Sequence, residues 1–173
     1  MNVRLPGLAM AVGLSLPVAA QAQMLQPGLW ELTSSNMKVD DQNLPDLQLI
    51  LGQLKNQMTP EQQAMLEKQG ITMGGKGIRV CLTPEQVKTD SIPLQDPQSG
   101  CQQQVTERNG QQWKFRFSCP KAQGTGVAHF LSDREFTTKV SGTFNAVGQQ
   151  QKGSLDTRAV WLGQECGAVK PRA

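Results

Sequence analysis

The sequence predicts an α+β fold with a single twisted antiparallel β-sheet of about six or seven strands in a meander. A helical insertion over residues 46–70 is expected to pack on one face of that sheet. Three observations favour this fold: apolar and polar side chains alternate with period two after residue 101, the connections there are short, and one earlier region has helical periodicity. An open β-barrel is the alternative.

The segment 1–22 has the features of a cleavable export signal. Arg4 precedes an apolar run, and Ala20-Gln21-Ala22 supplies the small-x-small pattern of a cleavage site. No later run is long and apolar enough to span a membrane. We therefore expect residues 23–173 to form a single disulfide-bonded periplasmic domain that does not span the membrane.

The charges exclude one class of partner. The chain carries 17 Lys and Arg against 14 Asp and Glu, which gives a net charge of +3, and no basic run of five or more residues occurs. Because nucleic-acid binding requires a concentrated basic surface, we expect no nucleic-acid partner.

All four cysteines lie after the signal: Cys81, Cys101, Cys119 and Cys166. An even number of cysteines in an exported chain indicates disulfides. Zinc ligands usually come in close C-x-x-C pairs, which this chain lacks. Four cysteines allow three pairings, and the number of cysteines alone does not select one.

A hairpin over residues 101–119 selects among these pairings. Asn109-Gly110 is a strong turn signal. A three-residue loop would place Cys101 opposite Cys119, whereas a two-residue loop would miss by one position. Opposed residues lie within the distance that a disulfide can bridge. By elimination, Cys81 is then expected to pair with Cys166.

Other segments also alternate, over residues 77–82, 126–131, 135–144 and 154–162, and a first strand begins at Leu29. Their apolar faces contain most of the aromatic side chains. These are expected to form the core or to line a groove for an apolar ligand: Trp30, Trp113, Phe115, Phe117, Phe136 and Trp161.

Helical periodicity is clearest in the insertion. Leu47, Ile50, Leu51, Leu54 and Met58 fall at three- and four-residue steps, and Thr59-Pro60 then begins a second helix with Gln62 at the reciprocal capping position. The same Thr-Pro-Glu-Gln recurs at 83–86, where we interpret it as another helix cap.

The ordered set PGLWELT, VCLTPEQ, Cys101 and Cys119 with Trp113 between them, and a closing WLGQEC resembles the domain of unknown function 3617 family. The family comprises small exported proteins of proteobacteria. The resemblance covers nearly all of the chain after the signal. It implies a periplasmic, disulfide-bearing single domain and supplies no activity, substrate or catalytic residue.

Three functions remain. The leading one is a non-catalytic periplasmic binding or interaction module of the cell envelope, whose partner is an envelope protein or a small apolar ligand. The second is a hydrolase that uses His129 with Asp133 or Glu135. The third is a copper binder that uses methionine thioethers, with candidates Met24, Met37, Met58, Met65 and Met73. No motif predicts a resident cofactor.

Overall fold

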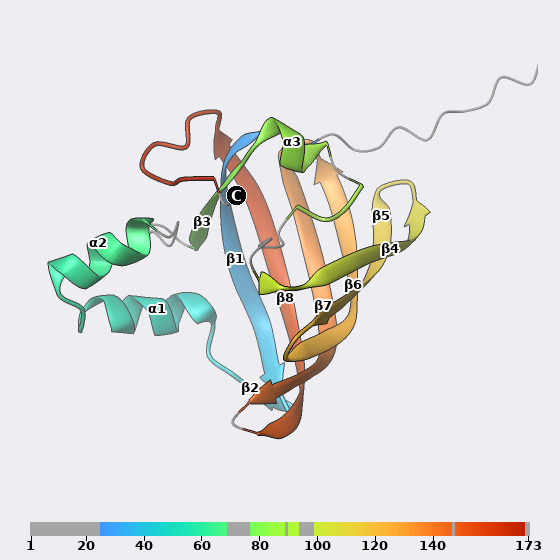
Figure 1. Ribbon diagram of the computed structural model, residues 1–173, viewed down its shortest axis with the longest axis horizontal. Helices are drawn as coiled ribbons and strands as arrows, with labels where there is room; N and C mark the ends of the chain where they lie inside the picture. The colour runs from blue at the N-terminus through green and yellow to red at the C-terminus, as the bar shows by residue number, and fades with distance from the viewer. Residues whose placement is uncertain (1–24, 69–76, 89, 94–98, 147, 172–173) are drawn as a thin grey trace, which may run out of the picture.

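The structure is a computed structural model that describes residues 25–68, 77–88, 90–93, 99–146 and 148–171 (Figure 1). In chain order the elements are β1 (Gly28–Val39), β2 (Gln42–Asn43), α1 (Leu47–Lys55), α2 (Pro60–Lys68), β3 (Ile78–Leu82), α3 (Pro84–Val87), β4 (Gln102–Asn109), β5 (Gln112–Cys119), β6 (Ala122–Ser132), β7 (Glu135–Ala146) and β8 (Gln149–Gly163). The expected export signal, residues 1–22, lies outside the described residues.

All strands belong to one antiparallel sheet. Strands β4 to β8 pair with their neighbours in the sequence, which confirms the predicted meander. The sheet is completed by β1, which pairs with β8 on one side and with β2 and β3 at its two ends on the other. The sheet is open, with β4 at its far edge, so the barrel alternative is wrong.

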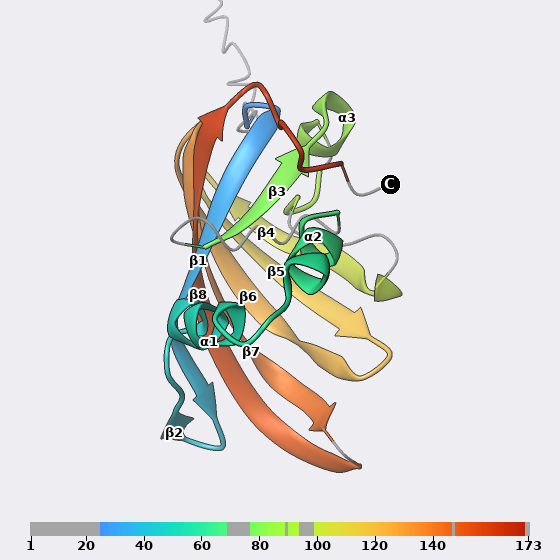
Figure 2. The same cartoon turned by 90° about the vertical axis from the view of Figure 1, so that its left-hand side faces the viewer.

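The sheet is strongly curved, and Figure 2 shows its concave side facing α3 and the C-terminal segment. Strand alternation places Phe136, Thr138, Val140, Gly142 and Phe144 of β7 on this concave face, and the sequence predicted that these five residues share a face. They pair with Ala159, Thr157, Leu155, Gly153 and Gln151 of β8. The residues between them project from the convex face.

The hairpin of β4 and β5 aligns Cys101 with Cys119, as predicted, through a two-residue loop and a β-bulge. Its loop has two residues, because Asn109 pairs with Gln112 and Gly110 has a φ of +55°. The shorter of the two loops considered is thus present, and by itself it would miss the register of Cys101 and Cys119 by one position. A β-bulge at Thr106 shifts the register by one residue, so that Gln102 pairs with Ser118. Cys101 is then disulfide-bonded to Cys119.

Both Thr-Pro-Glu-Gln sequences cap helices. At α3 the Thr83 hydroxyl accepts the Gln86 N–H, and the Gln86 side chain accepts the Thr83 N–H at 2.9 Å. The Thr59 N–H donates to Gln62 in the same way at α2. Hydrogen bonds to backbone N–H groups and to the capping threonines lower the pKa of Glu61 and of Glu85.

The helical insertion lies at the edge of the sheet instead of covering its face. The helix α1 contacts β1, and α1 and α2 lie beyond that strand (Figure 1). None of their described side chains joins the buried core, and Leu49, Ile50, Leu54 and Met65 are exposed. The expected helical cover is therefore wrong, because the apolar face of α1 is not turned onto the sheet.

A different segment covers the concave face. Leu82, Val87 of α3 and Ile92 pack there against the aromatic side chains of the sheet, together with Leu25. The aromatic rings form a row across four strands, with neighbouring centroids 4.8–5.6 Å apart: Trp30, Phe136, Phe130 and Trp113. We call this half of the concave face, with its row and its cover, the covered end.

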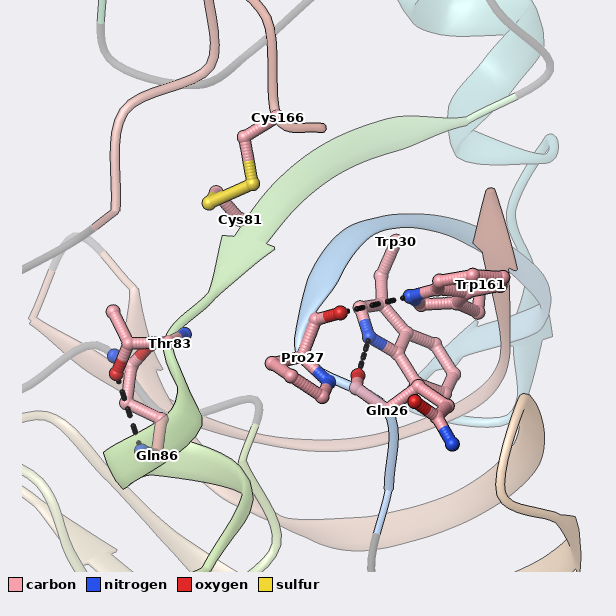
Figure 3. Close-up of a disulfide and its surroundings, with 8 residues drawn as sticks. All are labelled: Gln26, Pro27, Trp30, Cys81, Thr83, Gln86, Trp161 and Cys166. Carbon is pink, nitrogen blue, oxygen red and sulfur yellow. Dashed lines mark hydrogen bonds between the residues drawn. A yellow bond between two sulfur atoms is a disulfide. The ribbon is translucent and has the colours of Figure 1, made fainter. Parts of the chain in front are cut away.

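Two indole hydrogen bonds hold the segment that leads into β1 at the covered end (Figure 3). The Trp30 indole donates to the Gln26 carbonyl at 2.9 Å, and the Trp161 indole donates to the Pro27 carbonyl at 3.1 Å. The second disulfide, Cys81 to Cys166, joins β3 to the segment after β8. The predicted pairing of all four cysteines is thus present in the structure.

Candidate functional site

The six aromatic residues proposed as core or groove divide between those two roles. Trp30, Trp113, Phe115 and Phe136 are buried in the core. Phe117 and Trp161 are partly buried and pack against it. Most of this set therefore stabilises the fold, and Phe115 and Phe117 also line the concave face where it begins to open.

Beyond the aromatic row the concave face is not filled. Two adjoining hollows, of about 250 and 210 Å³, follow β7 from Thr138 to Phe144 and share Phe117 and Val140. The smaller one is lined almost entirely by apolar atoms. We call this half of the concave face the open end. It is lined by Phe117, Ala122, Val140, Gly142, Phe144, Gly153 and Leu155, with Met37 and Val39 of β1 at one side.

The depth of the open end comes from glycines on neighbouring strands. Gly124 pairs with Gly142, and Gly142 pairs with Gly153, so three of them form a row across β6, β7 and β8. A Cβ atom on Gly124 would collide with the Ser141 carbonyl, and one on Gly153 would meet the Phe144 ring at 2.8 Å. Only glycine fits at these positions, and its missing side chain leaves the floor low.

A polar hollow of about 420 Å³ lies beside the β5–β6 turn. Ala122 and Phe144 line both this hollow and the smaller apolar one, but its polar residues Gln123, Thr143 and Gln150 stand at convex-face positions of their strands. Its lining also includes Lys121 in the β5–β6 turn and Asn145 of β7. The Asn145 N–H donates to the Lys121 carbonyl at 2.8 Å, which holds the turn against β7.

The Cys101–Cys119 disulfide forms part of the wall of the open end. Its two cysteines have Cα atoms 4.0 Å apart. The bond joins the edge strand β4 covalently to β5, the strand with which β4 pairs in the sheet. The bond therefore fixes the far wall of the hollow. The other disulfide lies at the covered end (Figure 3).

The candidate base for hydrolysis lies on the other side of the sheet. His129 is exposed and pairs with Gln112 and Thr137 across the neighbouring strands. Its proposed partners are engaged elsewhere: Asp133 accepts from the Gln26 side chain at 2.7 Å, and Glu135 binds Arg158 at 2.7 Å. The structure does not bring these three residues together into a site.

Other charged groups on the convex face are paired. Lys139 contacts the Asp156 carboxylate at 3.2 Å, and the Asn36 side chain donates to it at 3.0 Å. Partial burial alone would raise the pKa of Asp156, but the hydrogen bonds from Asn36 and Lys139 lower it overall. This is the chemistry of an ordinary surface ion pair.

The copper candidates are scattered over different elements. Met37 lies in β1, Met58 follows α1, and Met65 is in α2 with its side chain exposed; Met24 and Met73 lie outside the described residues. Within the described ranges, no three His, Cys, Asp or Glu side chains come together in a way that could hold a metal ion. No helix in the described part of the chain has the length and hydropathy needed to cross a membrane.

Strand alternation predicts that Val140 and Phe144 lie on the apolar face, but it assigns them no role apart from the core. Glycines at alternate positions of β6, together with Gly142 and Gly153, were the available signal for a low floor. Which part of the face is covered depends on how residues 83–93 cross it, and periodicity carries no information about that path.

The family described as "Protein of unknown function (DUF3617)" matches residues 25–166. A protein of Pseudomonas putida, "Uncharacterized protein in lpd-3 5'region", is 64% identical over 143 residues, which cover 80% of this chain and 99% of that protein. No solved structure matches the chain. The chain therefore belongs to the DUF3617 family of proteins of unknown function.

Proposed function

We propose that this protein is exported to the periplasm and acts there as a non-catalytic binding module, with the open end of its concave face as the site for an apolar ligand. One observation carries the proposal. The same face that forms the core at the covered end continues as a nearly apolar hollow of about 210 Å³ at the open end. Concave, mostly apolar surfaces with a few polar groups at one side are typical ligand sites.

The proposed location is supported by the sequence and by the covalent structure. Residues 1–22 have the composition of a cleavable signal. Both cysteine pairs are disulfide-bonded, and such bonds persist in oxidising compartments.

The non-catalytic part of the proposal is supported by the position of the ionisable groups. His129 lies on the convex face, and the apolar hollow has no carboxylate among its described lining residues. A binding module of this kind should tolerate His129→Ala without loss of ligand binding or folding. Lost binding in a His129→Ala variant that melts normally would favour the hydrolase.

The site itself can be tested with a neutral fluorescent probe, N-phenyl-1-naphthylamine, whose emission rises on transfer to an apolar site. Val140 lines both hollows, so Val140→Phe should fill the open end and reduce probe binding at least tenfold. Thr137→Phe is the matched control, since Thr137 projects from the convex face of the same strand and lines neither hollow.

A second variant separates blocking from unfolding. Ala122→Phe acts at the boundary between the apolar and polar hollows and should also reduce binding while the protein keeps its melting temperature. Absence of probe binding by the unmodified protein would contradict the proposal. Native mass spectrometry of protein purified from periplasm should show a retained small apolar molecule. A retained protein in its place would show that the partner is an envelope protein and not a small ligand.

A further inference from the structure

The convex face has a hollow of its own, on the side of the sheet away from the proposed apolar site. Its volume is about 630 Å³, and it lies over β5, β6 and β7. None of the described residues that line it is Asp or Glu. The convex-face residues of these strands in its lining are Lys114, Arg116, Thr125, Val127, Lys139 and Ser141. The strand registers thus gather three cations that are scattered in the sequence.

Arg116 begins a row of hydrogen-bonding residues across the three strands. It pairs with Thr125 of β6, which pairs with Ser141 of β7. Neighbouring strands are about 4.8 Å apart, so the Cα atoms of the row span about 10 Å. All three residues are exposed. The row therefore presents a guanidinium group and two hydroxyls at the same hollow.

Two lysines flank this row without closing the hollow. Lys114 and Lys139 lie in the adjacent row, with the smaller side chain of Val127 between them. The Lys114 ammonium contacts Glu107 of β4 at 2.8 Å, and the Lys139 ammonium contacts Asp156 of β8 at 3.2 Å. Since β4 and β8 lie on the outer sides of β5 and β7, both ammonium groups are held away from the middle of the hollow.

Arg116 differs from these two lysines, because it makes no ion pair with any carboxylate of the described residues. Its planar guanidinium can donate to two oxygens of an oxyanion at once. A carboxylate has only two oxygens, which the guanidinium alone can satisfy. A phosphate group has further oxygens that can accept from the hydroxyls of Thr125 and Ser141, so the row favours phosphate over carboxylate.

On these grounds we propose that the convex hollow is a second binding site, which binds a phosphate group through Arg116, Thr125 and Ser141. The proposal goes beyond the apolar site and does not depend on it. A soluble phosphate ester and a phospholipid head group share this chemistry, and the test distinguishes the two sources.

The test begins with an NMR titration of the protein with glycerol 3-phosphate, at an ionic strength kept constant with sodium chloride. The backbone amide signals of Arg116, Thr125 and Ser141 should shift together and saturate. Acetate should bind at least fivefold more weakly, because it lacks the oxygens for the two hydroxyls. Glycerol should leave the signals unchanged.

One pair of variants tests the guanidinium group. Arg116→Gln should weaken binding of glycerol 3-phosphate at least tenfold, since hydrogen bonds between charged groups are the stronger ones. Arg158→Gln is the matched control, because it removes the same charge from the convex face of β8, outside the hollow. It should change the affinity less than twofold.

A second pair tests the hydroxyls. Thr125→Val keeps a β-branched side chain in the strand and should weaken binding about fivefold. Thr137→Val, on the convex face of β7 and outside the hollow, should leave it unchanged. Arg116 and Thr125 line neither apolar hollow, so their variants should keep the melting temperature and the binding of N-phenyl-1-naphthylamine.

Sedimentation with phosphatidylglycerol vesicles identifies the source of the phosphate. Vesicle binding that Arg116→Gln abolishes would support the site and assign the phosphate to a lipid head group, whereas binding of glycerol 3-phosphate alone would assign it to a soluble ester. Equal binding of acetate and glycerol 3-phosphate, or equal losses in Arg116→Gln and Arg158→Gln, would show a general effect of charge and overturn the site. Absence of binding to either phosphate source, or vesicle binding that Arg116→Gln leaves unchanged, would also overturn it.

Discussion

The covered end and the open end of the concave face are built from the same strands and differ in what lies over them. At the covered end, Leu25, Val87 and Ile92 pack onto the aromatic row, and Trp30 and Phe136 have no exposed surface. At the open end, Phe117, Val140 and Phe144 keep partial exposure, and glycines replace large side chains on the floor. The strand pattern is continuous across both, so stability and binding can be separated along one strand.

The largest expected effect is at the covered end. Trp30→Ala removes a fully buried indole and its hydrogen bond to Gln26, and such truncations cost about 3–5 kcal/mol. For a domain of this size the melting temperature should fall by roughly 2–4 °C per kcal/mol, hence by about 10 °C. Thermal unfolding followed by circular dichroism measures it. Trp30→Phe should recover a good part of the loss, and an unchanged melting temperature in Trp30→Ala would show that Trp30 is not core.

Two phenylalanines on the same face of β7 give the sharpest comparison. Phe136→Ala at the covered end should cost about 3–5 kcal/mol, because Phe136 is fully buried and contacts Trp30 and Phe130. Phe144→Ala at the open end should cost about 1 kcal/mol, since its ring is already partly exposed.

Denaturant unfolding of both variants measures the two losses of unfolding free energy. Phe144→Ala should also reduce probe binding, with only a small loss of stability. Equal losses of unfolding free energy in the two variants would show that the two ends are packed alike, and the distinction between them would fail.

A substitution in the glycine floor should lower the free energy of unfolding by a smaller amount than the aromatic truncations do. Gly124→Ala forces a Cβ atom against the Ser141 carbonyl and the Phe117 ring, and we expect a loss of about 1–3 kcal/mol in unfolding free energy. The control is Gly52→Ala in α1, where nothing lies within 4 Å of the added atom. There the change should stabilise the helix by up to about 1 kcal/mol. A neutral Gly124→Ala would mean that the floor can move outward.

The smallest effect is expected on the convex face, away from both ends. The pKa of Asp156 is lowered in the folded protein, so its ionised form adds stability above the unfolded pKa, and this contribution is lost as pH falls through the folded value. Asp156→Asn should therefore cost under about 1 kcal/mol at pH 7, as for other exposed pairs, and less at pH 2. Urea unfolding at the two pH values checks this, and a pH-independent difference would contradict it.

Local chemistry was predictable because it depends on near neighbours. The alternation of β5 and β7, the meander, both Thr-Pro-Glu-Gln caps and the cysteine pairing followed from the sequence, since each depends on residues close in the chain or on strand parity. The Thr106 bulge was not predictable, although it rescues the register that the two-residue loop at Gly110 would have broken. A bulge has no strong sequence signature, and only the opposed cysteines hinted that one was needed.

Long-range cover was not predictable. The apolar stripe of α1 was expected to face the sheet, yet Leu49 and Leu54 remain exposed and Val87 and Ile92 occupy the covered end. Several apolar segments compete for one surface, and the choice among them depends on connection lengths and packing that a periodicity does not encode. The open end follows from that choice, which is why only Phe115 and Phe117 of its lining were among the groove candidates from the sequence.

The pairing of β1 with β8 sets an order of events for a chain that is made, or threaded through a membrane, from its N-terminus. Trp30 emerges early, and its cross-strand neighbour Trp161 emerges almost last. Strands β4 to β7 can add hairpin by hairpin, whereas the edge of β1 that binds β8 waits unpaired, and such edges invite association with other chains. A copy truncated before β8 leaves that strand without its main partner, so proteases and chaperones can distinguish unfinished copies from finished ones by their first strand.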